Sequence, residues 1–240
     1  MSHRRTPVAL PPLLGIEFLS WLLKHHEGPT ILLICCTREG FLADLQANLK
    51  QLPCESPATT TSNANRGLVH PLLNPTIYLV ARSRSIHLVF VPTLPHLRAY
   101  LSTYKLPPNS ESSSLTSIQS GFRVPILAIW GLVYAHRSTA EHSAQGLSRT
   151  LAAAVESASL AKQRLVLAEA KIPGTGVQDG DTEAFDVTFE NLWKEQVPVL
   201  SGSIRFGGED RVWAGKTIEV GHILAKWCRF VKLSDEDRVL

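Results

Sequence analysis

The sequence is poor in the features that mark disulfide scaffolds, membrane proteins and strongly charged chains. Its four cysteines are too few for a disulfide framework in 240 residues, and Cys35 and Cys36 are neighbours in an apolar run. No uninterrupted apolar stretch reaches the roughly 18 residues of a membrane span. Lys and Arg exceed Asp and Glu by only 24 to 21, so charge neither requires nor excludes a nucleic-acid partner. We therefore expect a soluble intracellular protein with reduced thiols and no membrane partner.

The sequence also lacks a phosphate-binding loop. Such a loop needs glycines, a lysine and a hydroxyl at fixed spacing between a strand and a helix. After the apolar run 30–37, taken as the first strand, residues 37–40 (TREG) contain one glycine and no lysine. The triplet at 215–217 (GKT) has Asp210 in place of the preceding glycine, and too few residues follow it for further strand–helix units. We therefore predict no nucleotide-binding residues.

Candidate catalytic and metal-binding residues are missing as well. Nucleotide-hydrolysing sheets often hold Mg²⁺ with an acid at the end of an apolar strand. Trp130 stands near that position, and tryptophan has no oxygen ligand. His25 and His26 are adjacent, and His136 and His142 are six residues apart, so neither pair has metal-ligand spacing. The sequence predicts no catalytic residue, metal or cofactor, although a site assembled from separated residues remains an alternative.

Apolar runs alternate with amphipathic segments along most of the chain. This order predicts an α/β fold with a mostly parallel sheet flanked by helices, in a single domain over residues 1–240, with antiparallel strands at the C-terminal end. Polar segments 53–70, 107–121 and 171–184 are predicted to be mobile loops. The predicted helices are 13–26, 38–52, 75–82, 94–104 and, from the capping box Ser138-Thr139-Ala140-Glu141, 138–163. The predicted strands are 30–37, 86–91, 124–133, one starting at 165–168, then 185–189, 197–206 and 218–231, where the last has room for a helical turn.

Basic residues occur in small groups that suit contacts with nucleic-acid phosphates. Near the C-terminus, Lys226 and Arg229 alternate with Trp227 and Phe230, which would place basic and aromatic side chains on one surface. Ordinary solvated charges are the alternative. The candidate DNA-binding residues are Arg82, Arg84, Arg205, Arg211, Lys216, Lys226 and Arg229.

The order of these parts resembles a known family layout. A helix is followed by TILLICCTREGFLADL, IHLVFVPTLPHLRAYLSTY, VPILAIWGLV with an alanine-rich helix, and RLVLAEA before a strand-rich tail. Over residues 13–233 this resembles the RecA-like core of small recombinase paralogues, above all the members of Shu-type complexes that lack ATPase motifs. In outline it is also similar to the inactive RecA-like subunits of Elongator.

The resemblance implies a RecA-like fold and a non-catalytic role as a pseudo-ATPase. The chain would pair with another RecA-like subunit in a nuclear, or nuclear and cytoplasmic, DNA-repair complex and bind DNA to assist homologous recombination. We expect the apolar face of helix 13–26, with Phe18, Trp21 and Leu22, to dock the partner. The alternatives are a scaffold subunit of a tRNA-modifying Elongator-type assembly, an enzyme of another class, and an unrelated α/β interaction protein.

Overall fold

The computed structural model describes six stretches of the chain: residues 6–25, 28–51, 76–104, 124–171, 192–200 and 216–233, with only the backbone of Lys50 and Gln51. The predicted loops 53–70 and 107–121, nearly all of the loop 171–184, and the predicted strand 185–189 lie outside these residues. The single-domain assignment remains a prediction.

A six-stranded parallel sheet forms the centre of the structure, in the order β3-β2-β4-β5-β1-β8. The central strands are short runs of aliphatic residues that are buried on both faces, as expected for a covered parallel sheet. A separate antiparallel pair joins β6 (Gln196–Pro198) to β7 (Thr217–Glu219). The sheet strands are β1 (Val8–Ala9), β2 (Thr30–Ile34), β3 (Ile86–Phe90), β4 (Ile126–Trp130), β5 (Arg164–Ala168) and β8 (Arg229–Phe230).

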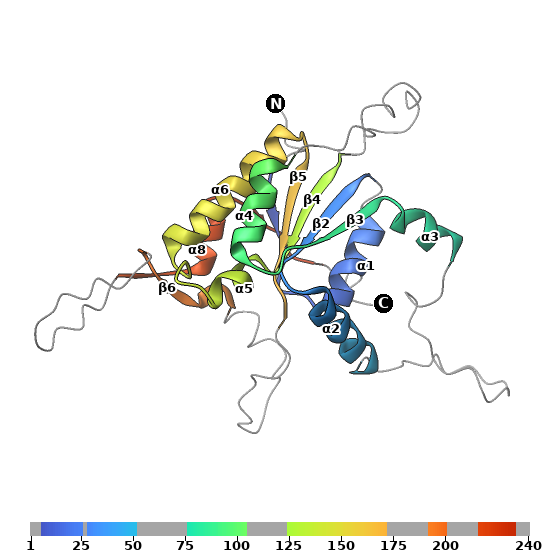
Figure 1. The fold of residues 1–240 in the computed structure, drawn as a ribbon, viewed down its shortest axis with the longest axis horizontal. Coiled ribbons are helices and arrows are strands. Elements are labelled where there is room, and N and C mark those ends of the chain that lie inside the picture. Colours follow the sequence, from blue (N-terminus) through green and yellow to red (C-terminus); the bar gives the residue numbers. More distant parts are fainter. Residues whose placement is uncertain are drawn as a thin grey trace, which may run out of the picture.

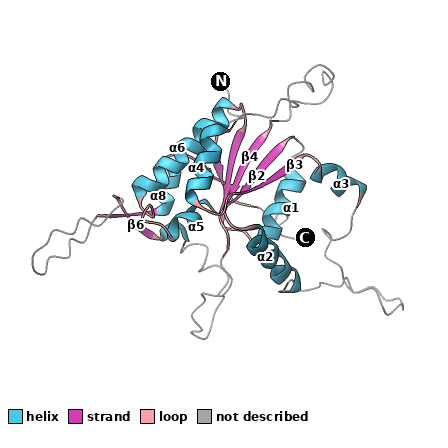
Figure 2. Ribbon diagram, in the orientation of Figure 1, coloured by secondary structure: helices cyan, strands magenta, loops and turns pink. Residues whose placement is uncertain are grey.

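Helices cover both faces of this sheet (Figures 1 and 2). Alternate residues of β2 enter two different cores: Leu32 packs with the residues of α1 and α2, and Leu33 packs with those of α4, α6 and α8. The helices are α1 (Gly15–His25), α2 (Arg38–Gln51), α3 (Ile77–Ser83), α4 (Leu94–Thr103), α5 (Leu132–Arg137), α6 (Ala144–Leu160) and α8 (Val220–Ala225).

The predicted fold class is therefore confirmed: a mostly parallel sheet flanked by helices, with a small antiparallel pair near the C-terminal end, is consistent with a RecA-like fold. One strand is in a place that the sequence did not indicate. Residues 30–37 were taken as the first strand, but β1 precedes them and lies between β5 and β8. Two residues are too few to show a strand pattern, and their pairing partners lie more than 150 positions away.

Two boundaries around α5 and α6 also differ from the prediction. The strand predicted for 124–133 ends at Trp130, because Gly131 adopts a φ of 83° and Leu132 starts a helix. The predicted capping box at 138–141 is wrong. The Ser143 hydroxyl accepts a hydrogen bond from the Gly146 N–H at 3.1 Å and caps α6 instead.

The strand predicted for 218–231 is likewise interrupted. Within it the chain forms β7, then the six residues of α8, then β8. Val220, Ile223 and Leu224 are buried against the main core, so helical spacing in this short stretch prevails over the strand-like composition. Of the predicted strand 197–206, only residues up to 200 are described, and β6 covers its beginning.

Candidate functional site

The carboxyl ends of the parallel strands are the usual place for a ligand in this type of sheet. The turn from β1 to α1, residues 10–14, lies at that end. Pro11 and Pro12 have no N–H, and the other three residues of the turn use theirs within the protein. Leu10, Leu13 and Leu14 donate to Leu167 O at 2.8 Å, Glu169 O at 2.9 Å and the Glu17 carboxylate at 2.8 Å, respectively. The turn therefore offers no free backbone donor to a phosphate.

Gly15, which follows this turn, serves helix packing. A Cβ at Gly15 would lie 3.1 Å from the Phe41 ring and 3.3 Å from Leu45, so its absence lets α1 approach α2 closely. Residues 37–40, predicted to follow the first strand, lie after β2, whereas the strand that leads into α1 is β1. Neither turn has the glycine–lysine pattern of such a loop.

Glu169 is a buried acid at the same end of the sheet, one residue beyond β5. Its side chain is 3% exposed and accepts backbone hydrogen bonds from Val133 at 2.8 Å and Tyr134 at 3.3 Å, in the first turn of α5. Burial raises the pKa of Glu169 to about 7, although these backbone donors and the Arg137 charge act in the opposite direction. This geometry is that of a buried carboxyl group that anchors α5 to the sheet.

The two cysteines near this end are poor nucleophiles, because burial keeps their thiols protonated. Burial, followed by the Glu169 charge, raises the pKa of Cys35 well above its ordinary value, and burial raises that of Cys36 to about 11. Trp130 packs edge-on against Phe41, with ring centroids 5.3 Å apart.

Within the described residues, no three His, Cys, Asp or Glu side chains are grouped as metal ligands. No helix in the same residues is long and apolar enough to cross a membrane.

The strand β3 forms one edge of the sheet, and its outer side is unpaired among the described residues. Thr30 N donates to Ser85 O at 2.8 Å, and Val91 N donates to Ile34 O at 2.9 Å. Both groups of a residue in a parallel ladder point to the same side, so residues 85, 87, 89 and 91 face β2. The N–H and C=O groups of Ile86, Leu88 and Phe90 therefore point outward, in position to pair with an added strand.

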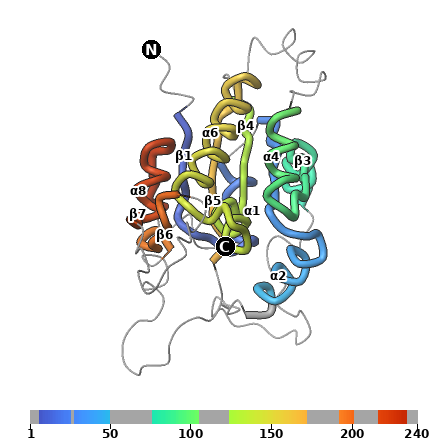
Figure 3. The backbone as a smooth tube through the Cα atoms, turned by 60° about the vertical axis from the view of Figure 1, so that its left-hand side comes forward, coloured from blue at the N-terminus to red at the C-terminus, as the bar shows by residue number. Residues whose placement is uncertain are grey.

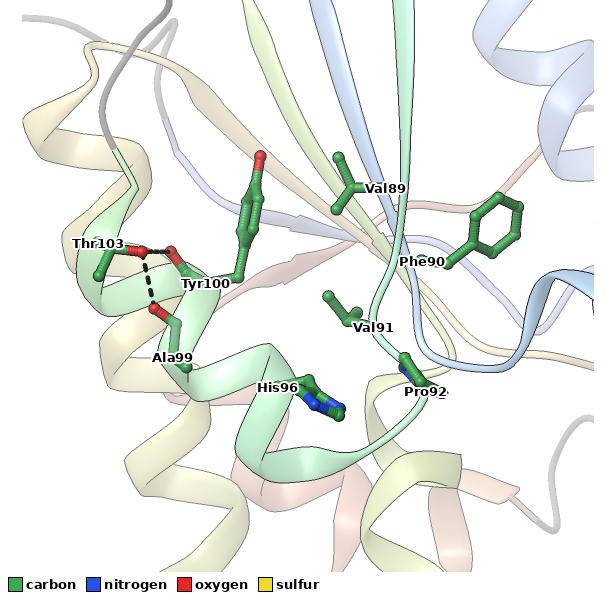
Figure 4. Close-up of a pocket in the computed structure, with 8 residues that line it drawn as sticks. All are labelled: Val89, Phe90, Val91, Pro92, His96, Ala99, Tyr100 and Thr103. Carbon is green, nitrogen blue, oxygen red and sulfur yellow. Dashed lines mark hydrogen bonds between the residues drawn. The ribbon is translucent and has the colours of Figure 1, made fainter.

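An apolar groove of about 420 Å³ runs beside this edge, between β3 and α4 (Figure 4). On the other face of β3, Leu88 is 44% exposed, and three side chains of α3, which has no buried residue, are exposed as well: Ile77, Tyr78 and Val80. The groove is lined by Val89, Phe90, Val91, Pro92, His96, Ala99, Tyr100 and Thr103.

The edge unit is also one-sided in charge. Residues 76–104, which form α3, β3 and α4, contain no Asp or Glu. They contain three arginines and two histidines, of which Arg98 is paired with Glu141 at 3.2 Å. Among the described residues, the edge therefore combines outward backbone groups that no strand pairs, an apolar groove and a segment without acidic side chains.

The predicted DNA-binding residues fall on two sides of the molecule. Arg82 and Arg84 are in and directly after α3, beside β3, whereas Lys216, Lys226 and Arg229 surround α8 beside β8, at the other edge of the sheet (Figure 3). Arg205 and Arg211 lie outside the described residues.

The predicted partner-docking residues are placed differently from the expectation. Phe18, Trp21 and Leu22 are 1%, 9% and 0% exposed, and all three pack in the core between α1 and the sheet. The apolar face of α1 covers the chain's own sheet and is not an exposed docking surface. The edge groove at β3 was missed because no apolar stripe marks it; the available signal was the absence of acids over residues 76–104.

Comparison with known proteins gives one family and a weak structural likeness. A family profile described as SPAC22G7.03-like matches residues 13–178. No curated protein matches. Among solved structures, a chain from "The Structure Of A DnaB-Like Replicative Helicase And Its Interactions With Primase" is similar at 11% identity and a TM-score of 0.35. The match covers 77% of this chain and 44% of that chain, so this chain corresponds to less than half of its length.

Proposed function

The chain belongs to the SPAC22G7.03-like family, and we propose that it is a non-catalytic binding subunit that docks a partner protein along β3 and binds DNA. In this proposal the partner is another RecA-like subunit, and the pair assists homologous recombination in the nucleus. The observation that carries the proposal is the β3 edge, where the backbone groups of Ile86, Leu88 and Phe90 point outward beside an apolar groove, with no pairing strand in the described part of the chain.

Exposed edge strands are normally blocked, because they pair readily with other chains. Here the side chains of His87 and Leu88 are exposed, so the edge is accessible. The described strand β3 contains no bulge, proline or acid that would block pairing. An extended peptide that pairs with β3 gains main-chain hydrogen bonds and places alternate side chains in the groove. The acid-free surroundings favour a partner segment with apolar residues for the groove and acidic residues beside it.

The closed turn at residues 10–14 supports the non-catalytic part of the proposal. A nucleotide phosphate would need backbone donors that here bond to Leu167, Glu169 and Glu17. Opening the turn would break these bonds and expose Leu10 and Leu13, which are 0% and 4% exposed. We therefore expect Mg²⁺-ATP to leave the melting temperature of the full chain unchanged; a shift of several degrees at millimolar nucleotide would contradict this expectation.

The assignment to recombination rests on the resemblance of layout to the recombinase paralogues. A scaffold role in an Elongator-type, tRNA-modifying assembly is the alternative, because that resemblance extends to its RecA-like subunits. The recombination role and the Elongator-type role differ in the proteins that should co-purify with the full chain. They also differ in whether the complex should prefer DNA or tRNA.

The proposal is tested by affinity capture with the full chain and two edge variants. Leu88→Pro removes an outward N–H while leaving the ladder to β2 intact, because the groups of Leu88 point away from β2. Ala99→Glu puts a negative charge in the exposed lining of the groove. Ala47→Glu, on the exposed face of α2, is the matched control.

We expect the wild-type chain and Ala47→Glu to recover a RecA-like protein with recombination factors, and both edge variants to lose it by tenfold or more. Equal recovery by the edge variants would show that β3 is not the docking site. Recovery of tRNA-modification subunits instead would replace the recombination role with the alternative.

A further inference from the structure

The amino ends of the parallel strands meet at one end of the sheet, and in this chain that end is basic. Arg84 lies two residues before β3, Arg164 is the first residue of β5, and Arg229 is the first residue of β8. Lys162 and Lys226 occupy the turns directly before β5 and β8, and both are exposed. The sequence scatters these five residues over almost 150 positions, and the parallel topology gathers them.

The described turns at this end contain no acid to balance the charge. The described turns before β2, β3, β4, β5 and β8 are 28–29, 84–85, 124–125, 161–163 and 226–228, and none contains Asp or Glu; in the sequence, Glu27 stands directly before the first of them. The nearest acid in a helix that ends here is the exposed Glu156 of α6. Elsewhere in the molecule, arginines have acidic partners: Arg98 pairs with Glu141, and Arg137 pairs with Glu195.

Two of the arginines lie on β5 and β8, the strands on either side of β1. Val8 pairs with Arg229 on one side and with Val166 on the other, and Arg164 precedes Val166 by two residues, so both arginines project from the same face of the sheet. Burial and the Arg229 charge lower the pKa of Arg164. The buried Nε of Arg164 has no hydrogen-bond partner among the described residues. An anion bound between these guanidinium groups would offset their mutual repulsion and accept a hydrogen bond from the Arg164 Nε.

The spacing of the basic residues suits an extended polyanion better than a single ion. From β3 to β8 there are five interstrand steps, and at about 4.8 Å per step they span about 24 Å. A DNA strand rises about 3.4 Å per base pair, so this distance corresponds to about seven base pairs. Figure 1 shows the amino ends of β2, β4 and β5 together at the upper end of the sheet, away from the turns that follow β2 and β4.

We propose that the basic amino end of the sheet, formed by Arg84, Lys162, Arg164, Lys226 and Arg229, binds the phosphate backbone of nucleic acid. This deepens the DNA-binding part of the proposed function and rests on it, but it is independent of docking at β3. Contacts to phosphate carry no sequence information, so binding is expected to be sequence-independent and sensitive to salt.

The test measures the affinity of the full chain for a fluorescent 20-base-pair duplex by anisotropy at several salt concentrations. The variant Lys226→Ala/Arg229→Ala removes two charges from the basic end. The control Arg38→Ala/Lys232→Ala removes two exposed charges from the opposite end of the sheet, where Lys232 follows β8. Circular dichroism confirms that each variant is folded.

We expect the first variant to bind at least tenfold more weakly at 50 mM salt and the slope of log K against log salt to decrease by about two, while the control changes little. Equal losses in the two variants, or no binding at 50 mM salt, would overturn the proposal. Competition by poly-glutamate as effective as that by DNA of equal charge would assign the surface to an acidic protein instead. The Leu88→Pro variant should bind DNA normally. A failure of docking at β3 is therefore distinguishable from a failure of DNA binding at the amino end of the sheet.

Discussion

At the scale of single residues, the buried carboxyl of Glu169 makes the stability of the protein depend on pH. The folded chain keeps the proton of Glu169 up to a pKa of about 7, whereas the ordinary value is 4.5. Its contribution to stability is therefore fully present below pH 4.5 and is lost as the pH rises through 7. Relative to Glu169→Gln, we expect wild-type protein to lose about 3 kcal/mol of unfolding free energy between pH 4.5 and pH 8, measured by urea denaturation.

Comparison with Glu169→Gln isolates this effect from other titrations. Burial lowers the pKa of His136, which acts in the opposite direction because stability is lost as the pH falls below the pKa of the unfolded histidine. His136 is present in both proteins, so its contribution cancels in the difference. A difference that does not vary with pH would show that Glu169 is ionised throughout and anchors α5 as a carboxylate.

Lys162 gives a second prediction at this scale. It adopts a φ of 55° directly after α6, where Lys162 N donates to Ser159 O at 3.0 Å and Gln163 N donates to Ala158 O at 2.8 Å. This is the Schellman arrangement, in which glycine is preferred. Lys162→Gly should stabilise the protein by about 1 kcal/mol, seen as a higher urea midpoint, while weakening DNA binding. A lower midpoint would contradict this account of the turn.

At the scale of elements, the start of α6 shows where sequence reasoning failed. Ser138 and Ser143 both precede acceptable helical sequence, and the capping-box spacing favoured Ser138. In the structure Ser138 ends α5, because Gly131 turns the chain into a helix directly after β4. That turn is held by Glu169, which accepts hydrogen bonds from N–H groups 36 and 35 positions earlier in the chain, and no local pattern reveals such a contact.

The two serines can be compared directly. Ser143→Ala removes the acceptor for Gly146 N–H and should cost about 1 kcal/mol of unfolding free energy, whereas Ser138→Ala should change it by less than about 0.5 kcal/mol. Chemical denaturation of both variants checks this expectation. A larger loss for Ser138→Ala would restore the capping box at 138–141.

At the scale of the whole molecule, the sequence predicted the layers but not the surfaces. The aliphatic runs of β2, β4 and β5 and the stripes of the longer helices mark an α/β sheet because burial on both faces requires them. The role of each surface depends on which strands lie at the edges of the sheet and on which residues the parallel strands bring together at each end. Helix α1 was expected to dock a partner and instead covers the sheet, while the open edge at β3 follows only from the strand order.

The central claim, that a partner adds to β3, is tested most directly by residue-resolved hydrogen exchange of the full chain alone and in its captured complex. The amides of His87 and Val89 face β2 and should be protected in both states. The amides of Ile86, Leu88 and Phe90 face outward, so the account predicts fast exchange in the free chain and at least tenfold slowing in the complex. Unchanged exchange at these three amides in a complex that remains intact would contradict it.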